Sequence, residues 1–132
     1  MVGPVELLKK LQVKSGTRLW LINVPETIAE ALTAGTEVEP VRQGDPFDGA
    51  IAFCANPAEV APFAGQILAH LPEDGLLWFA YRKGAAAKAS GLSRDTGWEP
   101  LKAQGLDTVR SVAIDDEWTG LRFRPVRAIK RA

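Results

Sequence analysis

Residues 76–81 read LLWFAY, a stretch made only of apolar and aromatic side chains. An unbroken apolar run of this length is typical of a strand that is covered on both of its faces. A second run of this kind lies within DGAIAFC, residues 48–54. Between the two, residues 57–71 carry apolar side chains at helical spacing, and Pro57 suits the first turn of a helix. Two buried strands joined by a helix predict a parallel βαβ unit, which decides the fold class.

The alternation of strand and helix extends toward the N-terminus. Residues 18–23, RLWLIN, predict a strand, and Pro25 then opens a helix that Gly35 ends. Residues 36–41 alternate weakly between apolar and polar side chains, which predicts a strand near an edge of the sheet. Residues 4–11 place apolar side chains at helical spacing and predict a short amphipathic helix.

Toward the C-terminus the pattern becomes antiparallel. Residues 82–93 are rich in glycine, alanine, serine and lysine, which predicts a loop. Thr96 and Glu99 have the spacing of a capping box, which predicts a helix running to about residue 104. Residues 108–114 and 118–123 predict two strands, and the three acidic residues between them are too few for a crossover. These two strands must therefore pair antiparallel.

The whole pattern predicts one α/β domain over residues 1–132, with three layers and no linker. Its sheet is expected to be mostly parallel and to end in a C-terminal antiparallel β-hairpin. The only cysteine, Cys54, excludes an internal disulfide and a structural zinc cluster. We see neither a signal peptide nor an apolar run of membrane-spanning length, so we expect a cytoplasmic protein without membrane contact.

The charges cancel overall but are unevenly placed. Residues 1–81 carry 5 basic and 10 acidic side chains, whereas residues 82–132 carry 11 basic and 6 acidic ones. Five basic side chains fall within the last eleven residues: Arg122, Arg124, Arg127, Lys130 and Arg131. This asymmetry suits an anionic partner or self-association into a homo-oligomer, and the alternative is a solvated strand and tail. Zero net charge and the lack of a nucleic-acid-binding module disfavour a nucleic acid as that partner.

Three passages carry a resemblance to a known family: LKKLQVKSGTRL at 8–19, FDGAI at 47–51, and ILAHLPEDGLLW at 67–78. They resemble the approach to the first strand, the fourth strand, and a later helix–turn–strand passage of class I S-adenosylmethionine-dependent methyltransferases. The resemblance implies a Rossmann-like, methyltransferase-like sheet in a reduced form that lacks one strand–helix unit.

A second resemblance is to small bacterial proteins of unknown function that share this reduced layout. It is carried by WFAYRKG at 78–84, RDTGW at 94–98 and WTGLR at 118–122. These motifs imply kinship and bring no activity with them.

The chain departs from the methyltransferase pattern where the cofactor would bind. The turn after the first strand, residues 23–26, reads NVPE and has no glycine for close backbone approach. Pro25 removes an amide, and Glu26 would oppose the carboxylate of the cofactor. The second strand ends in Val41 and Arg42, where an acidic residue should hold the ribose. We therefore expect no cofactor, and a non-catalytic binding or interaction module on a degenerate methyltransferase-like scaffold.

The loop after the central strand supplies the alternative, a binder of, or an enzyme for, a small anionic metabolite. In open α/β sheets, ligands bind outside the carboxyl ends of the strands, where cationic side chains and a helix start suit an anion. The candidate ligand-binding residues of this loop are Arg82, Lys83, Gly84, Lys88, Arg94, Asp95 and Trp98. The structural alternative is a solvated loop, with Trp98 packed into the core.

Other reactive side chains are better explained by structure. His70, the only histidine, is expected to be solvated at a helix end, and Cys54 to be an inert core thiol. Asp115, Asp116 and Glu117 would suit a hard cation, but consecutive turn residues point in different directions. We therefore name no catalytic residue and no metal ligand.

Overall fold

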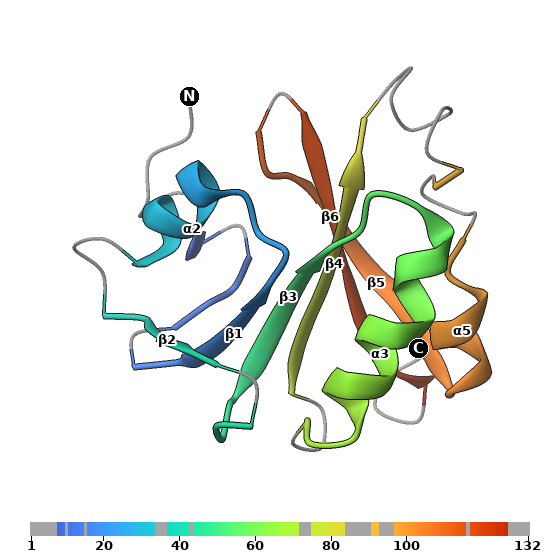
Figure 1. Cartoon of the computed structure of the whole chain (residues 1–132), viewed down its shortest axis with the longest axis horizontal. Coiled ribbons are helices and arrows are strands. Elements are labelled where there is room, and N and C mark those ends of the chain that lie inside the picture. The colour runs from blue at the N-terminus through green and yellow to red at the C-terminus, as the bar shows by residue number, and fades with distance from the viewer. Residues whose placement is uncertain are drawn as a thin grey trace, which may run out of the picture.

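The computed structural model describes residues 8–9, 11–14, 16–33, 37–42, 44–71, 75–83, 91–92, 97–115 and 117–126. These residues form a six-stranded sheet in the order β2-β1-β3-β4-β6-β5 (Figure 1). The strands are β1 (Arg18–Ile22), β2 (Glu39–Val41), β3 (Gly49–Phe53), β4 (Leu76–Arg82), β5 (Leu106–Ala113) and β6 (Trp118–Pro125).

The sheet is parallel from β2 to β4 and then ends in an antiparallel hairpin. Strand β1 pairs in parallel with both β2 and β3, and β3 pairs in parallel with β4. Strand β6 runs antiparallel to both β4 and β5. The predicted mostly parallel sheet with a C-terminal hairpin is therefore confirmed, and β2 lies at an edge as expected.

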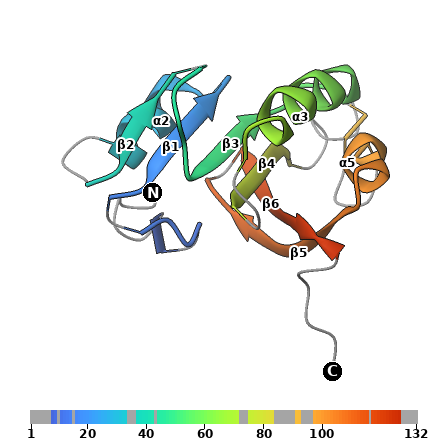
Figure 2. The ribbon, with the colours of Figure 1, turned by 90° about the horizontal axis from the view of Figure 1, so that it is seen from below.

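Helices lie on both faces of the sheet and complete the three layers. Helices α3 (Val60–Leu68) and α5 (Glu99–Ala103) lie side by side on one face (Figure 2). Helix α2 (Glu26–Thr33) packs on the other face, where its Ile28 and Leu32 join a separate core. A short 3-10 turn, η1 (Pro57–Glu59), leads into α3 and begins at the predicted proline. In the described part of the chain, no helix has the length and apolar character needed to cross a bilayer.

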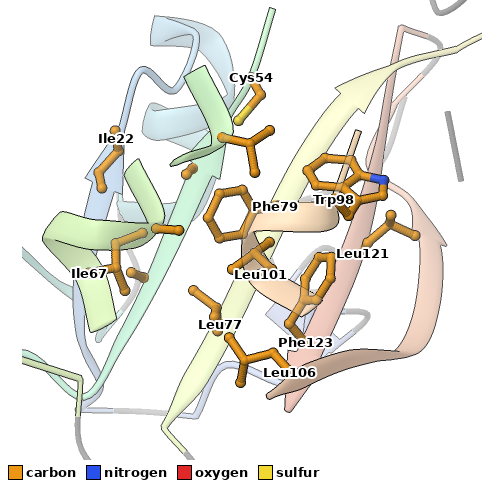
Figure 3. Packing of buried hydrophobic residues seen from close by; sticks show 14 of the residues in the cluster. Ile22, Cys54, Ile67, Leu77, Phe79, Trp98, Leu101, Leu106, Leu121 and Phe123 are labelled. Carbon is orange, nitrogen blue, oxygen red and sulfur yellow. The ribbon is translucent and has the colours of Figure 1, made fainter. Parts of the chain in front are cut away.

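The central strands are buried on both faces, as their sequences predict. Along β4, Leu77, Phe79 and Tyr81 face α3 and α5, while Trp78 and Ala80 face α2. Figure 3 shows the first of these cores, where side chains from β4, β6, α3 and α5 meet around Phe79.

Glycine is required at the start of β3. A Cβ atom on Gly49 would lie 2.7 Å from the Cβ of Leu76 and 2.8 Å from its carbonyl oxygen. The absence of a side chain thus lets β3 and β4 approach closely at the amino edge of the sheet.

One predicted helix start differs in the structure, and another predicted helix lies largely outside the described residues. Helix α5 begins at Glu99 with Trp98 as its N-cap and without a side-chain cap. The predicted Thr96–Glu99 capping box is therefore wrong, because Glu99 is the first helical residue and not the third. Of the predicted helix over residues 4–11, only Leu8 and Lys9 are helical among the described residues, and residues 1–7 and 10 lie outside them.

Candidate functional site

The carboxyl edge of the parallel strands is the natural place for a ligand in this topology. The chain leaves β1 toward β2 on one side and returns to β3 on the other, so the strand order reverses between β1 and β3. Ligands of open α/β sheets bind in the crevice at such a switch point. The residues that follow β1, β2, β3 and β4 therefore form the candidate site.

Asn23 lies at the switch point, directly after β1. Its φ of 55° is left-handed, a conformation in which asparagine is the best tolerated residue after glycine. Its side-chain Nδ2 donates a hydrogen bond of 3.0 Å to the carbonyl oxygen of Phe53. The end of β1 is thereby tied directly to the end of β3.

The neighbouring backbone amides are also paired within the protein. The amide of Ala55 donates to Oε1 of Glu59 at 2.5 Å, and the amide of Cys54 donates to the carbonyl oxygen of Ala80 at 2.9 Å. These two amides are therefore already paired within the protein.

The residues at the switch point do not fit S-adenosylmethionine. Pro25 has no amide to offer, and Glu26 places a carboxylate in the first turn of α2. Glu59 adds a second negative charge beside Cys54. Beyond β2, the amide of Arg42 donates to Asp45, and no acidic side chain follows the strand directly. The carboxylate and the ribose of the cofactor would both lack their usual partners.

Cys54 is a core residue. It is fully buried, and burial, together with the negative charge of Glu59, raises the pKa of its thiol from the ordinary 9.0 to about 12. A thiol with this pKa stays protonated at neutral pH and is a poor nucleophile. This agrees with the inert thiol expected from the sequence.

The predicted anion-binding residues are only partly visible. Arg82 ends β4 and is exposed, and Lys83 follows it with a half-buried side chain. The predicted residues Gly84, Lys88, Arg94 and Asp95 lie outside the described residues.

Trp98 does not face a ligand. It is 1 % exposed, and its ring centroid lies 6.0, 5.9 and 5.6 Å from the rings of Phe79, Tyr81 and Phe123 (Figure 3). The core packing weighed as the alternative is what the structure shows, because these four aromatic rings fill the space between α5 and the sheet. Trp98 therefore leaves the set of candidate binding residues.

The structure adds two neighbours of Arg82 that sequence reasoning missed. The β4–β6 register places Arg82 opposite Trp118, and the guanidinium carbon lies 4.9 Å from the centroid of that ring. Nη1 of Arg82 lies 3.8 Å from Oε2 of Glu117. The pairing of β4 with β6 was the missing information, since no local signal links residues so far apart in the chain.

The acidic turn has a structural role. Oδ1 of Asp115 accepts hydrogen bonds of 2.8 Å from the amides of both Glu117 and Trp118. Such a bond pattern stabilises the turn between the hairpin strands. Within the described ranges, no group of three potential metal ligands occurs, and Asp116 lies outside them.

Two hollows lie away from the carboxyl edge. A groove of about 490 Å³ between α3 and α5 is lined by residues such as Ala61, Gly65 and Ala103, and none of its lining side chains is charged. A smaller hollow of about 260 Å³ is lined by Asp45 and by His70, which is exposed just beyond α3. Neither hollow brings together a nucleophile and a base.

The basic C-terminal residues are only partly described. On β6, Arg122 donates a hydrogen bond to Oε1 of Gln12 and lies opposite Arg110 of β5. The predicted residues Arg127, Lys130 and Arg131 lie outside the described residues.

Comparison with solved structures finds the same fold in an N-methyltransferase and in two other proteins that bind S-adenosylmethionine. The N-methyltransferase NodS from Bradyrhizobium japonicum WM9 superposes with a TM-score of 0.56 at 14 % identity, covering 92 % of this chain and 93 % of that one. Fibrillarin from Aeropyrum pernix, bound to S-adenosylmethionine, gives 0.53 at 16 % identity over 84 % and 67 % of the two chains. A mutant of MtNAS, also bound to S-adenosylmethionine, gives 0.58 at 14 % identity over 92 % and 61 %.

These likenesses concern the fold alone, because the sequence identities are low. The chain has a Rossmann-like, methyltransferase-like α/β fold. No family model matches the chain, and no curated protein matches it either. The resemblance to a small bacterial family therefore stays a prediction.

Proposed function

We propose that this chain is a non-catalytic binding or interaction module on a methyltransferase-like scaffold whose cofactor crevice is closed. The observation that carries this proposal is the 3.0 Å bond from Asn23 to the carbonyl oxygen of Phe53 across the switch point. Pro25 and Glu26, directly after it, remove an amide and add a negative charge where the cofactor carboxylate would lie. We also propose a cytoplasmic location, which the single buried free cysteine supports.

The test is a titration with S-adenosylmethionine and with its demethylated product, S-adenosylhomocysteine. A ligand that binds only the folded state raises the melting temperature, and at 100 times its Kd it adds about 2.7 kcal/mol of stability. For a chain of this size that corresponds to a rise on the order of 10 °C. We expect a shift below about 1 °C from either compound, because the crevice offers neither free amides nor an acidic ribose partner.

The control is an N-methyltransferase of the same fold, measured in the same plate. A rise on the order of 10 °C for this chain as well would overturn the proposal and make methyl transfer the leading hypothesis.

A second candidate function is the binding of a small anionic metabolite beyond the end of β4. One observation favours it: the Arg82 guanidinium lies over Trp118 and makes no hydrogen bond within the described part of the chain. We propose that Arg82 and Lys83 act there together with Gly84, Lys88, Arg94 and Asp95. This candidate is compatible with the first, because an anion bound at β4 does not need the crevice at β1.

A further inference from the structure

Arg82 is held in place by an aromatic ring. Trp118 lies opposite it on β6 and is 7 % exposed, so its indole has a fixed position. The ring packs edge-on against Phe53 at 4.7 Å, which anchors it in the core between β3 and β6. The guanidinium carbon lies 4.9 Å from the centroid of this ring, within the range of cation–π attraction, which holds the cation without using its N–H donors.

Arg18, at the start of β1 and so at the amino edge of the parallel strands, is an arginine whose guanidinium is fully paired with a carboxylate. Its Nη2 and Nε donate to the two carboxylate oxygens of Asp48 at 2.9 and 3.2 Å. That bidentate pair keeps the pKa of Asp48 below its ordinary value. Arg82 has the same fork of donors but lacks such a partner among the described residues.

The contact of Arg82 with Glu117 is a loose one. The distance of 3.8 Å from Nη1 to Oε2 exceeds hydrogen-bond length, and the two side chains are 47 % and 69 % exposed. Exposed pairs of this kind contribute little and are readily exchanged for another anion. The backbone of Glu117 is nevertheless held nearby, because its carbonyl oxygen accepts a 2.9 Å bond from the amide of Lys83.

We propose that Arg82, held over the ring of Trp118, is the primary anchor for an oxyanion, a carboxylate or a phosphate, and that Glu117 is an internal competitor for it. This inference rests on the second candidate function above and names its ligand chemistry. Both oxyanions accept two parallel N–H bonds from a guanidinium, and the ligand carboxylate or phosphate replaces the Glu117 carboxylate at Nη1.

The experiment follows the indole N–H resonance of Trp118 by NMR during titrations with inorganic phosphate and with citrate, at constant ionic strength. Trp118→Phe identifies the resonance. We expect a saturable shift in the wild-type protein with at least one of the two anions. Phosphate alone indicates a phosphorylated ligand, citrate alone a carboxylated one, and both indicate general oxyanion binding. No saturable shift with either anion overturns the inference.

Three variants test the anchoring role of Arg82, and a fourth serves as the control for general charge effects. Arg82→Ala should weaken binding at least about tenfold, as expected for loss of a charged hydrogen-bond partner. Arg82→Lys should bind more weakly than wild type but better than Arg82→Ala, because it keeps the charge and loses the fork. Glu117→Gln should bind about two- to fivefold more tightly, the gain expected from removing a weak competing ion pair.

The matched control is Arg110→Ala, which removes one positive charge from β5. Arg110 pairs with Arg122, which lies four residues along β6 from Trp118 and therefore roughly 13 Å from it. It should change the affinity less than about twofold. Equal losses in Arg110→Ala and Arg82→Ala would show a non-specific charge effect and overturn the inference, as would unchanged or weaker binding in Glu117→Gln. A separate titration with S-adenosylmethionine keeps the two proposals apart, since its binding contradicts the closed crevice and leaves the Arg82 result intact.

Discussion

At the scale of single residues, the carboxyl edge shows how local partners decide what a side chain can do. Asn23 adopts a left-handed backbone conformation, and its side-chain amide donates a hydrogen bond to the carbonyl oxygen of Phe53. Glu59 takes up the amide of Ala55, and its charge also raises the pKa of the buried Cys54 thiol. Arg82, by contrast, lies over the ring of Trp118, and its guanidinium makes no hydrogen bond with the described residues. At the ends of β1 and β3 the polar groups are paired within the protein, whereas the only described carboxylate beside Arg82 is the loosely placed one of Glu117.

Cys54 permits a direct test of burial. Raising its pKa from 9.0 to about 12 makes the thiolate fraction at pH 8 roughly 1,000-fold smaller than in the unfolded chain. We therefore expect Cys54 to react with a disulfide reagent such as dithiobisnitrobenzoate at least about 1,000-fold more slowly in native protein than in guanidinium chloride. The measurement is the absorbance of the released thiol. Rapid stoichiometric labelling under native conditions would show that the thiol is accessible and reopen its candidacy as a nucleophile.

At the scale of elements, α5 depends on packing more than on its own helical stability. It has five residues and no side-chain cap, and helices this short are unstable alone. Trp98 and Leu101 attach it to the aromatic cluster on β4 and β6, where both are almost completely buried. The position of this helix is therefore set by the cluster and not by its capping residues.

Trp98→Ala tests this dependence. Removing a fully buried tryptophan should cost roughly 3–5 kcal/mol in the free energy of unfolding, since the sheet cannot close the cavity. Lys102→Ala, on the exposed side of the same helix, is the control and should change it by less than about 0.5 kcal/mol. Urea denaturation followed by circular dichroism measures both. A loss below about 1 kcal/mol for Trp98→Ala would mean that the ring is not part of the core.

At the scale of the whole molecule, two hydrophobic cores share one sheet. Strands β3 and β4 contribute alternate residues to each core. Because both cores pack against the same strands, unfolding one core would also disrupt the other. The fold matches that of the methyltransferase NodS along nearly the whole chain. In the described residues the sheet has six strands.

This arrangement predicts that residues 1–132 unfold as a single domain. We expect one calorimetric transition in which the calorimetric and van't Hoff enthalpies are equal. If the midpoint lies around 60 °C, this enthalpy should be about 90 kcal/mol for a chain of 132 residues. Differential scanning calorimetry makes the measurement. Two resolved transitions would contradict the single-domain prediction and assign the cores to separate folding units.

The sequence by itself determined the class of fold. Apolar runs of strand length predict β3 and β4 as strands buried on both faces, and the short acidic linker forces β5 and β6 into a hairpin. It also pointed to the missing cofactor turn, because Asn23, Pro25 and Glu26 are neighbours in the chain. These features depend on periodicity and local chemistry, which are readable over a few residues.

Only the tertiary structure decided which distant residues meet. The bond from Asn23 to Phe53 spans 30 positions, and the contact of Arg82 with Trp118 requires β6 to insert beside β4 in one particular register. Register and strand order arise from the packing of whole faces, so a local pattern does not encode them. For the same reason Trp98, placed beside a ligand by its position in the loop sequence, packs instead as the centre of an aromatic core.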